Sequence, residues 1–197
     1  MFITFEGTEG CGKSTLIQNL SRKLTELKIP HIVTREPGGT PVAESIRKVI
    51  LQQEMDSLTE LFLYEAARAE HLKTTIEPAL KLKKWVLCDR FTDSTVAYQG
   101  FARNLNLKMI EQLNKLATLG IKPDLTFFLD LPVEVGLSRA TDANKFEQAG
   151  VEFQKKVRRG FLYQIKKSKK RFRILKVAKK NPEQVCADAM KALEPYL

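Results

Sequence analysis

Residues 7–14 decide the fold, and they read Gly7-Thr8-Glu9-Gly10-Cys11-Gly12-Lys13-Ser14. This run fits the pattern G-x-x-x-x-G-K-[ST] without a mismatch. Residues 2–6 before it are mainly apolar and predict a buried strand, and residues 13–28 after it carry apolar side chains at helical spacing. A strand, a glycine-rich turn and a helix in this order predict a phosphate-binding loop, or P-loop.

The residue types of this loop explain how it would bind a nucleotide. Glycines let backbone N–H groups converge on phosphate oxygens, and the N-terminus of the following helix adds its partial positive charge. We expect Lys13 to reach the β- and γ-phosphates, Ser14 to bind Mg²⁺ and Thr15 to lie near the α-phosphate. The sequence therefore predicts ATP and Mg²⁺ as cofactors. The expected ATP-binding residues are Gly7, Thr8, Glu9, Gly10, Cys11, Gly12, Lys13, Ser14 and Thr15.

The rest of the chain alternates short apolar runs with longer amphipathic runs. The apolar runs predict further strands at residues 31–34, 84–89, 125–130 and 173–177. The amphipathic runs predict helices at residues 41–52, 106–119, 133–141 and 150–171, and a last helix that opens at Pro182. Residues 57–82 predict two helices that meet near His71. In the helix 41–52, the side chains expected to point inward are Val42, Ile46, Val49 and Ile50.

Strands separated by helices imply right-handed crossovers and a parallel sheet covered on both faces. We therefore predict an α/β protein with the P-loop NTPase fold, in which helices flank both faces of a five-stranded parallel sheet. Residues 1–197 suit a single domain, since no linker or repeat divides them. Ligands of such sheets bind beyond the carboxyl ends of the strands, so polar residues that follow strands are candidates for the site.

Composition narrows the class of protein. No apolar run approaches the roughly 20 residues that span a bilayer, and the N-terminus lacks the basic start of a secretory signal. The three cysteines have no paired spacing, which argues against a disulfide framework and a zinc site. We therefore expect a cytoplasmic protein without a membrane partner. The net charge of +10 is concentrated in residues 155–180 and is most simply a solvated helix face.

Four further segments carry polar residues where a ligand would bind. They are residues 34–40 (TREPGGT), 64–71 (YEAARAEH), 89–100 (DRFTDSTVAYQG) and 123–125 leading to 129–132 (PDL, LDLP). Together with the P-loop, they resemble the thymidylate kinases of the bacterial type, in matching order from residue 1 to about residue 140. The resemblance implies a nucleoside monophosphate kinase that phosphorylates dTMP to dTDP with ATP and Mg²⁺ in dTTP biosynthesis. It also implies a homodimer formed through helices within residues 41–80 and 106–118.

Asp89 and Arg90 end a predicted interior strand, at the ligand edge of the sheet. A carboxylate there can hold Mg²⁺ or its waters, or accept the proton of the acceptor. The resemblance implies that Arg90 binds the monophosphate, a task that suits a guanidinium fork. A structural ion pair of Asp89 is the alternative. We thus assign catalytic roles to Lys13, Asp89 and Arg90, and metal binding to Ser14 and Asp89.

The resemblance also implies the contacts to dTMP. Tyr64 and Arg68 share a helix face and would stack on thymine and bond a base carbonyl, unless they are a core aromatic and a surface arginine. Ser94 and Thr95 would reach the base edge, although Thr95 stands at a position that varies in the family. Tyr98 would pack where a ribose 2′-hydroxyl would lie, Arg47 would contact the acceptor phosphate and Glu9 the 3′-hydroxyl. The expected acceptor-binding residues are Glu9, Pro37, Arg47, Tyr64, Arg68, Arg90, Ser94, Thr95, Tyr98 and Gln99.

Positively charged groups must also neutralise the negative charge of the phosphoryl group during its transfer. Some thymidylate kinases carry an arginine in the P-loop where this chain has Gly10, so the chain resembles the type that uses a lid. The expected lid covers residues 139–150 and offers Arg139 and Lys145 as catalytic cations. Family lids usually have arginine where Lys145 stands, and the counterpart of Arg139 usually stacks on adenine. The choice of cation stays open between these residues and the downstream pair Arg158-Arg159.

Two other functions are also compatible with the sequence. One is a kinase of a different nucleoside or nucleotide on the same scaffold, which the base contacts of Arg68 and Thr95 would distinguish. The other is a nucleotide-dependent ATPase that binds nucleic acid, suggested by the basic residues 155–180. The acceptor-site segments argue against the second reading, so we do not expect a nucleic-acid partner.

Overall fold

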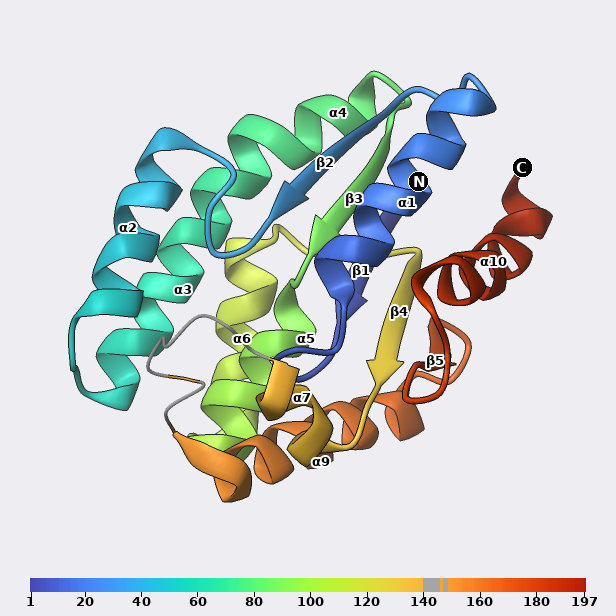
Figure 1. Cartoon of the computed structure of the whole chain (residues 1–197). Coiled ribbons are helices and arrows are strands. Elements are labelled where there is room, and N and C mark those ends of the chain that lie inside the picture. The colour runs from blue at the N-terminus through green and yellow to red at the C-terminus, as the bar shows by residue number, and fades with distance from the viewer. Residues whose placement is uncertain (140–145, 147–148) are drawn as a thin grey trace.

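Five parallel strands form the central sheet of the computed structural model, which describes residues 1–139, 146 and 149–197 (Figure 1). Their bounds are Phe2–Glu6 (β1), His31–Arg35 (β2), Trp85–Asp89 (β3), Leu125–Asp130 (β4) and Phe172–Lys176 (β5). The strand order is β2-β3-β1-β4-β5, and every neighbouring pair is parallel. The predicted five-stranded parallel sheet is therefore confirmed. Its middle strand, β1, leads directly into the P-loop.

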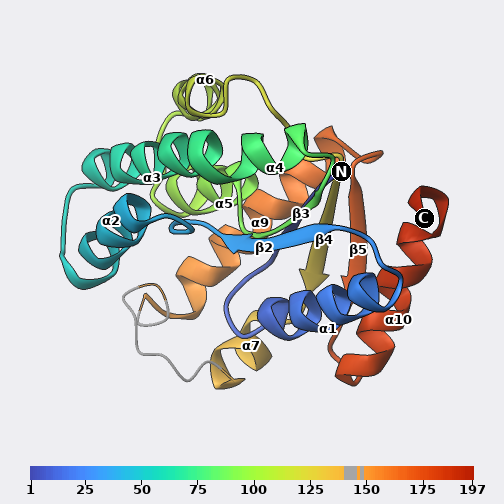
Figure 2. The same ribbon diagram turned by 90° about the horizontal axis from the view of Figure 1, so that it is seen from above.

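Helices cover both faces of the sheet, and Figure 2 shows α1 and α10 on one face and α3, α4, α5 and α9 on the other. The helices are Lys13–Glu26 (α1), Pro41–Gln52 (α2), Ser57–His71 (α3), Glu77–Lys81 (α4), Thr92–Thr95 (α5), Leu107–Ala117 (α6), Val133–Arg139 (α7), Gly150–Lys167 (α9) and Pro182–Leu193 (α10). Two π-helical segments, Leu72–Ile76 and Val96–Ala102, continue α3 and α5, and a 3-10 turn covers Glu194–Tyr196. No helix in the described part of the chain is long and apolar enough to cross a membrane.

The structure differs from the sequence-based expectations in three places. The helical segment 92–102 was not predicted, because the polar residues of α5 hide its helical period. The helix expected at 150–171 ends at Lys167, since residues 168–171 turn into β5. In α2, Val42 and Val49 are 54% and 44% exposed, so the prediction that they point inward was wrong. The buried residues of α2 are Ala43 and Ile50, because that face packs against α3.

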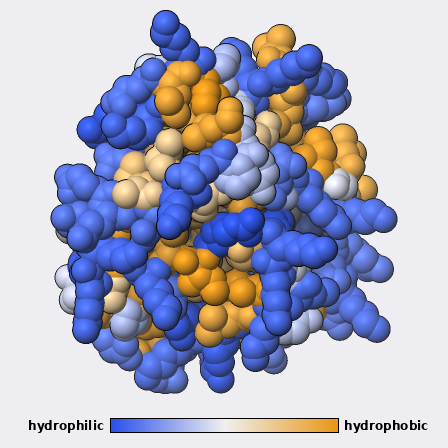
Figure 3. Space-filling view, turned by 90° about the vertical axis from the view of Figure 1, so that its right-hand side faces the viewer, coloured by the Kyte–Doolittle hydropathy of each residue, from blue (hydrophilic) through white to orange (hydrophobic). Residues whose placement is uncertain are grey.

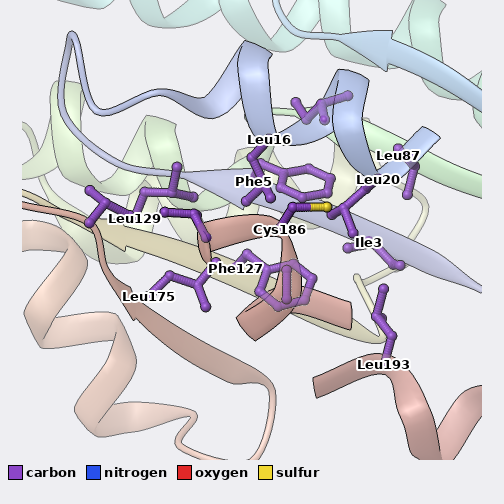
Figure 4. Packing of buried hydrophobic residues seen from close by; sticks show 14 of the residues in the cluster. Ile3, Phe5, Leu16, Leu20, Leu87, Phe127, Leu129, Leu175, Cys186 and Leu193 are labelled. Carbon is purple, nitrogen blue, oxygen red and sulfur yellow. The ribbon is translucent and has the colours of Figure 1, made fainter. Parts of the chain in front are cut away.

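The largest cluster of buried apolar residues in the described structure lies between the sheet and α1 and α10, and further clusters lie on the opposite face. All five residues of β1 are buried, as expected for a middle strand covered on both faces. Figure 4 shows Phe5 of β1 and Phe127 of β4 beside Leu16 and Leu20 of α1, with Cys186 of α10 in the same cluster. The Phe5 and Phe127 rings stack with their centroids 5.6 Å apart. This packing fixes the start of the P-loop, because residue 7 follows β1 directly.

Part of the positive charge of residues 155–180 is ion-paired. Guanidinium groups pair with carboxylates in Arg158–Asp130 (2.8 Å) and Arg171–Asp93 (2.6 Å), and ammonium groups do so in Lys155–Glu152 (2.9 Å) and Lys167–Glu111 (2.6 Å). The face that carries α10 and the edge strand β5 is mainly hydrophilic, with separate apolar patches (Figure 3). This arrangement agrees with a solvated surface.

Candidate active site

The P-loop is held in shape by its glycines and by the lysine that ends it. Gly10 has φ 67°, and a Cβ at this position would overlap the backbone carbonyl of Gly136 in α7. Neither the conformation nor the space admits a side chain there, so the P-loop cannot carry the arginine that some thymidylate kinases place at this position. Lys13 is 7% exposed, and its Nζ donates to the carbonyl of Thr8 over 3.3 Å. Its ammonium group therefore lies inside the concave side of the loop.

Ser14 and Asp89 meet at the carboxyl edge of the sheet. The Ser14 hydroxyl is 3.5 Å from Oδ2 of Asp89, a long contact that a cation between them could replace. The other oxygen, Oδ1 of Asp89, is buried without a hydrogen-bond partner in the described part of the chain. Mg²⁺ is commonly held by one or two protein oxygens together with water and phosphate oxygens. This pair of residues therefore fits a magnesium ion.

A pocket beside the P-loop brings together all ten residues that the sequence analysis assigned to the acceptor. Four further residues line it: Glu36, Leu51, Phe91 and Phe146. Glu36 lies in the segment TREPGGT and Phe91 in the segment DRFTDSTVAYQG, so these motifs could have pointed to them, whereas Leu51 carries no local signal. We call this pocket the acceptor pocket. Its lining residues are Glu9, Glu36, Pro37, Arg47, Leu51, Tyr64, Arg68, Arg90, Phe91, Ser94, Thr95, Tyr98, Gln99 and Phe146.

Arg90 stands between the P-loop and the acceptor pocket. Its backbone has φ 67°, a left-handed conformation that a non-glycine residue adopts only when its surroundings hold it there. Nη1 donates to the carbonyl of Gly7 (3.0 Å) and to the hydroxyl of Ser94 (3.1 Å), and Nη2 donates to Glu9 (2.8 Å). The guanidinium group also lies over the Tyr98 ring, 5.1 Å from its centroid. These contacts fix a planar cation at the mouth of the pocket.

Glu9 is an acid inside a loop that binds anions, and its neighbours explain how it stays charged. Burial opposes its ionisation, but Arg90 and Lys13 outweigh burial and hold the pKa of Glu9 at about 2. The hydroxyl of Tyr98 donates to the same carboxylate oxygen as Arg90, over 2.8 Å. Glu9 is therefore a carboxylate at neutral pH, and it links the P-loop to the acceptor pocket.

Arg68 is 2% exposed and lies in a network of buried polar groups. Its Nε donates to Glu36 over 2.8 Å, and its Nη1 donates to Glu65 (2.8 Å) and Asn114 (2.7 Å). His71 contacts the second oxygen of Glu36 at 3.0 Å. Among the described residues, no hydrogen bond uses Nη2 of Arg68, so this nitrogen remains available for a ligand in the pocket. The alternative of a surface arginine does not hold.

The remaining pocket residues add one cation and several polar contacts. Arg47 of α2 donates to the carbonyl of Pro37 over 2.9 Å, so it is not a freely solvated charge. Gln99 donates to Glu60 over 2.9 Å. The Thr95 hydroxyl is buried without a partner in the described part of the protein, which leaves it free to bond a ligand. Tyr64 lines the pocket on the same helix face as Arg68.

The expected lid is only partly described. Arg139 is exposed at the end of α7, and Phe146 is buried with its ring 5.7 Å from that of Tyr98. Lys145 and most of the range 139–150 lie outside the described residues. Arg158, an alternative cation, donates to Asp130 from two nitrogens, at 3.0 and 2.8 Å.

Glu6 is a titratable residue that the sequence analysis did not single out. Its carboxyl is fully buried at the end of β1, and burial together with the neighbouring Asp93 raises its pKa from 4.5 to about 8. The only local signal for Glu6 is its charge, in a buried strand whose other residues are all uncharged. Between pH 4.5 and 8 the folded protein therefore keeps a proton that the unfolded chain has released.

The free energy of unfolding should consequently fall as pH rises through this window, and Glu6→Gln should reduce that fall. Urea unfolding of both proteins at pH 5.5 and at pH 8 measures the effect. We expect the stability difference between variant and parent to shift in favour of the variant at pH 8. An equal pH dependence in the two proteins would contradict the assignment.

The sheet order, the P-loop that follows its middle strand and the adjoining pocket define the class of the protein, a P-loop NTPase. The family model "Thymidylate kinase" matches residues 5–189. The chain is 50% identical to a thymidylate kinase of Geotalea uraniireducens over 186 residues, which cover 88% of this chain and 87% of the relative. It is 46% identical to one from Synechococcus sp. (strain JA-2-3B'a(2-13)), over 100% of this chain and 96% of the relative.

A solved structure agrees with these matches. The crystal structure of a thymidylate kinase from Ehrlichia chaffeensis matches with a TM-score of 0.83 and 37% identity, over 98% of both chains. The chain belongs to the thymidylate kinase family.

Proposed function

We propose that the protein transfers the γ-phosphoryl group of ATP to dTMP, giving ADP and dTDP, with Mg²⁺ as the metal ion. The observation that supports this most directly is the acceptor pocket, which opens beside the P-loop and shares Arg90 and Glu9 with it. A donor site and an acceptor site that share a cation suit in-line transfer between two bound nucleotides.

On this proposal, the P-loop binds the phosphates of ATP and Lys13 neutralises charge that develops on the transferred group. Ser14 and Asp89 would hold Mg²⁺, which supplies further neutralisation of the phosphate oxygens. Arg90 and Arg47 bind the phosphate of dTMP at the mouth of the pocket. Little covalent chemistry is required of the protein, since positioning and charge neutralisation supply most of the catalysis of phosphoryl transfer.

Base selection would come from two groups with unused hydrogen-bonding capacity. Nη2 of Arg68 can donate to a thymine carbonyl, and the buried Thr95 hydroxyl lacks a partner in the described structure. Tyr64 supplies an aromatic ring to the same pocket. Tyr98 is fixed by its bond to Glu9, so its ring would exclude a ribose 2′-hydroxyl.

A coupled assay of ADP release with ATP and Mg²⁺ tests the proposal. We expect fast turnover with dTMP, slower turnover with dUMP and negligible turnover with AMP, CMP or GMP, because the latter bases do not match the donor and acceptor pattern above. ATP binding without turnover of dTMP would leave the P-loop assignment in place and reject the acceptor.

We also propose a cytoplasmic homodimer. Its support is a set of exposed apolar side chains on α2, α3 and α6, of which α3 contacts both other helices. Isolated apolar residues are ordinary on a surface, but several on neighbouring helices suit an interface. These residues are Val42, Val49, Leu58, Phe62 and Leu116.

A further inference from the structure

Glu6 has none of the catalytic or binding roles proposed above, yet it lies beside the residues that have them. It is the last residue of β1 and precedes Gly7, the first residue of the P-loop. Its side chain is 0% exposed. A buried carboxyl group is costly unless its oxygens are bonded, so its partners show what it holds in place.

Both carboxyl oxygens of Glu6 bond to the segment that follows β3. Oε1 accepts the backbone N–H of Phe91 over 2.8 Å, and Oε2 accepts the hydroxyl of Ser94 over 2.6 Å. The same Ser94 oxygen accepts Nη1 of Arg90 over 3.1 Å. With Glu6 ionised, Glu6, Ser94 and Arg90 therefore form a directed relay, in which the hydroxyl donates to the carboxylate and accepts from the guanidinium group.

Two cations, Arg90 and Arg171, lie near Glu6, and only Arg90 is joined to it by the relay. Asp93 of α5 is a neighbouring carboxylate that raises the pKa of Glu6, and its two oxygens both accept hydrogen bonds from Arg171, at 2.6 and 2.7 Å. Arg171 also donates to Thr126 of β4 over 2.6 Å. Arg171 is thus committed to Asp93, whereas Arg90 is joined to Glu6 through the Ser94 hydroxyl.

The backbone conformation of Arg90 indicates what the relay does. The residue has φ 67°, and the Phe91 N–H that follows it is the one that Glu6 accepts. Glu6 thus restrains both ends of this arginine, the backbone on its carboxyl side and the guanidinium group through Ser94. A residue in an unfavourable conformation keeps it only where several contacts determine it together.

We propose that Glu6 is a positioning residue that acts through Ser94 to aim Arg90 at the phosphate of the acceptor. This inference rests on the proposed function and assigns to Ser94 a task directed at the phosphate, not at the base edge. It makes a specific demand: damage to the relay should weaken the binding of a ligand that carries the phosphate and spare a ligand that lacks it.

Calorimetric binding of dTMP and of thymidine to five proteins, at a pH about one unit above the pKa of about 8 of Glu6, tests the relay. They are the parent, Glu6→Gln, Ser94→Ala, the double variant and the control Asp124→Asn. In Glu6→Gln, the amide oxygen can still accept the Phe91 N–H, but the amide nitrogen cannot accept the Ser94 hydroxyl. The control removes a carboxylate that accepts the backbone N–H of Phe2 over 2.7 Å, at the opposite end of the same strand.

We expect Glu6→Gln and Ser94→Ala each to weaken dTMP binding about tenfold, the effect of losing one hydrogen bond to a charged group, and to leave thymidine binding within about twofold. The double variant should bind dTMP no more weakly than either single variant, because each single substitution already removes the hydrogen bond between Glu6 and Ser94. Asp124→Asn should bind both ligands like the parent.

Equal loss of dTMP and thymidine binding in Glu6→Gln, or additive losses in the double variant, would overturn the inference. Should Glu6→Gln fail to fold, Ser94→Ala decides alone: a loss confined to dTMP supports the relay, and any other result rejects it. A parent protein that does not bind dTMP would instead refute the proposed function, and the inference with it. If Glu6→Gln binds dTMP as tightly as the parent does, the inference is refuted and the proposed function stands.

Discussion

Lys13→Ala is expected to lower kcat for ATP and dTMP by on the order of 10²–10³-fold, the loss typical when a transition state loses one electrostatic partner in a water-excluded site. Lys13 is 7% exposed. Among the described residues, the one oxygen that accepts a hydrogen bond from its ammonium group is the Thr8 carbonyl, at 3.3 Å. Its charge is therefore free to act on phosphate oxygens. Steady-state kinetics with saturating substrates measure the effect.

The matched control for this prediction is Lys23→Ala on the same helix. Lys23 has a 53% exposed side chain and pairs with Glu26, far along α1 from the P-loop. Its removal should leave kcat unchanged, and both variants should unfold at nearly the same urea concentration as the parent. A Lys13→Ala enzyme with parental kcat would show that the lysine does not act in the transition state.

Arg68→Met is expected to lower the free energy of unfolding by about 3–5 kcal/mol, the range for breaking a buried ion pair from one side. The substitution leaves the Glu36 and Glu65 carboxylates without the guanidinium group that now bonds both. Both acids are nearly buried, so water cannot replace the lost partner. Urea unfolding followed by circular dichroism measures the loss.

Arg35→Met is the control, because it also removes an ion-paired guanidinium group, although Arg35 pairs with one carboxylate and Arg68 with two. The Arg35–Glu44 distance is 2.9 Å, close to the 2.8 Å of Arg68–Glu36, but the Arg35 side chain is 54% exposed. Its loss should cost less than about 1 kcal/mol. Similar losses in the two variants would mean that burial does not set the strength of the Arg68 network.

The sequence predicted those parts of the fold and site that depend on local order along the chain. Residues 2–14 contain a strand, a loop and a helix start in one uninterrupted run, and their residue types leave few alternatives. The five parallel strands and the helices on both faces follow from similar alternation, whereas the order of the strands in the sheet was not predicted. The placement of Tyr64 and Arg68 on one face follows from their spacing of one helical turn.

Features that depend on contacts between distant segments could not be predicted. Nothing near Arg68 in the sequence shows that Asn114, 46 residues away, accepts one of its hydrogen bonds. Helix α2 alone does not reveal which of its apolar faces meets α3, which is why Val42 and Val49 were misplaced. The relay from Glu6 to Ser94 spans 88 residues and joins the end of β1 to helix α5.

Glu9 and the Gly7 carbonyl belong to the P-loop, and both bond to Arg90, while Tyr98 shares the same carboxylate of Glu9. The donor and acceptor sites are consequently not exchangeable modules. A designer who grafts the acceptor pocket of another kinase onto this scaffold would have to transplant position 9 with it. Conversely, a P-loop swapped in from an enzyme that lacks an acid at that position would leave a guanidinium group without its counter-charge in the neighbouring pocket.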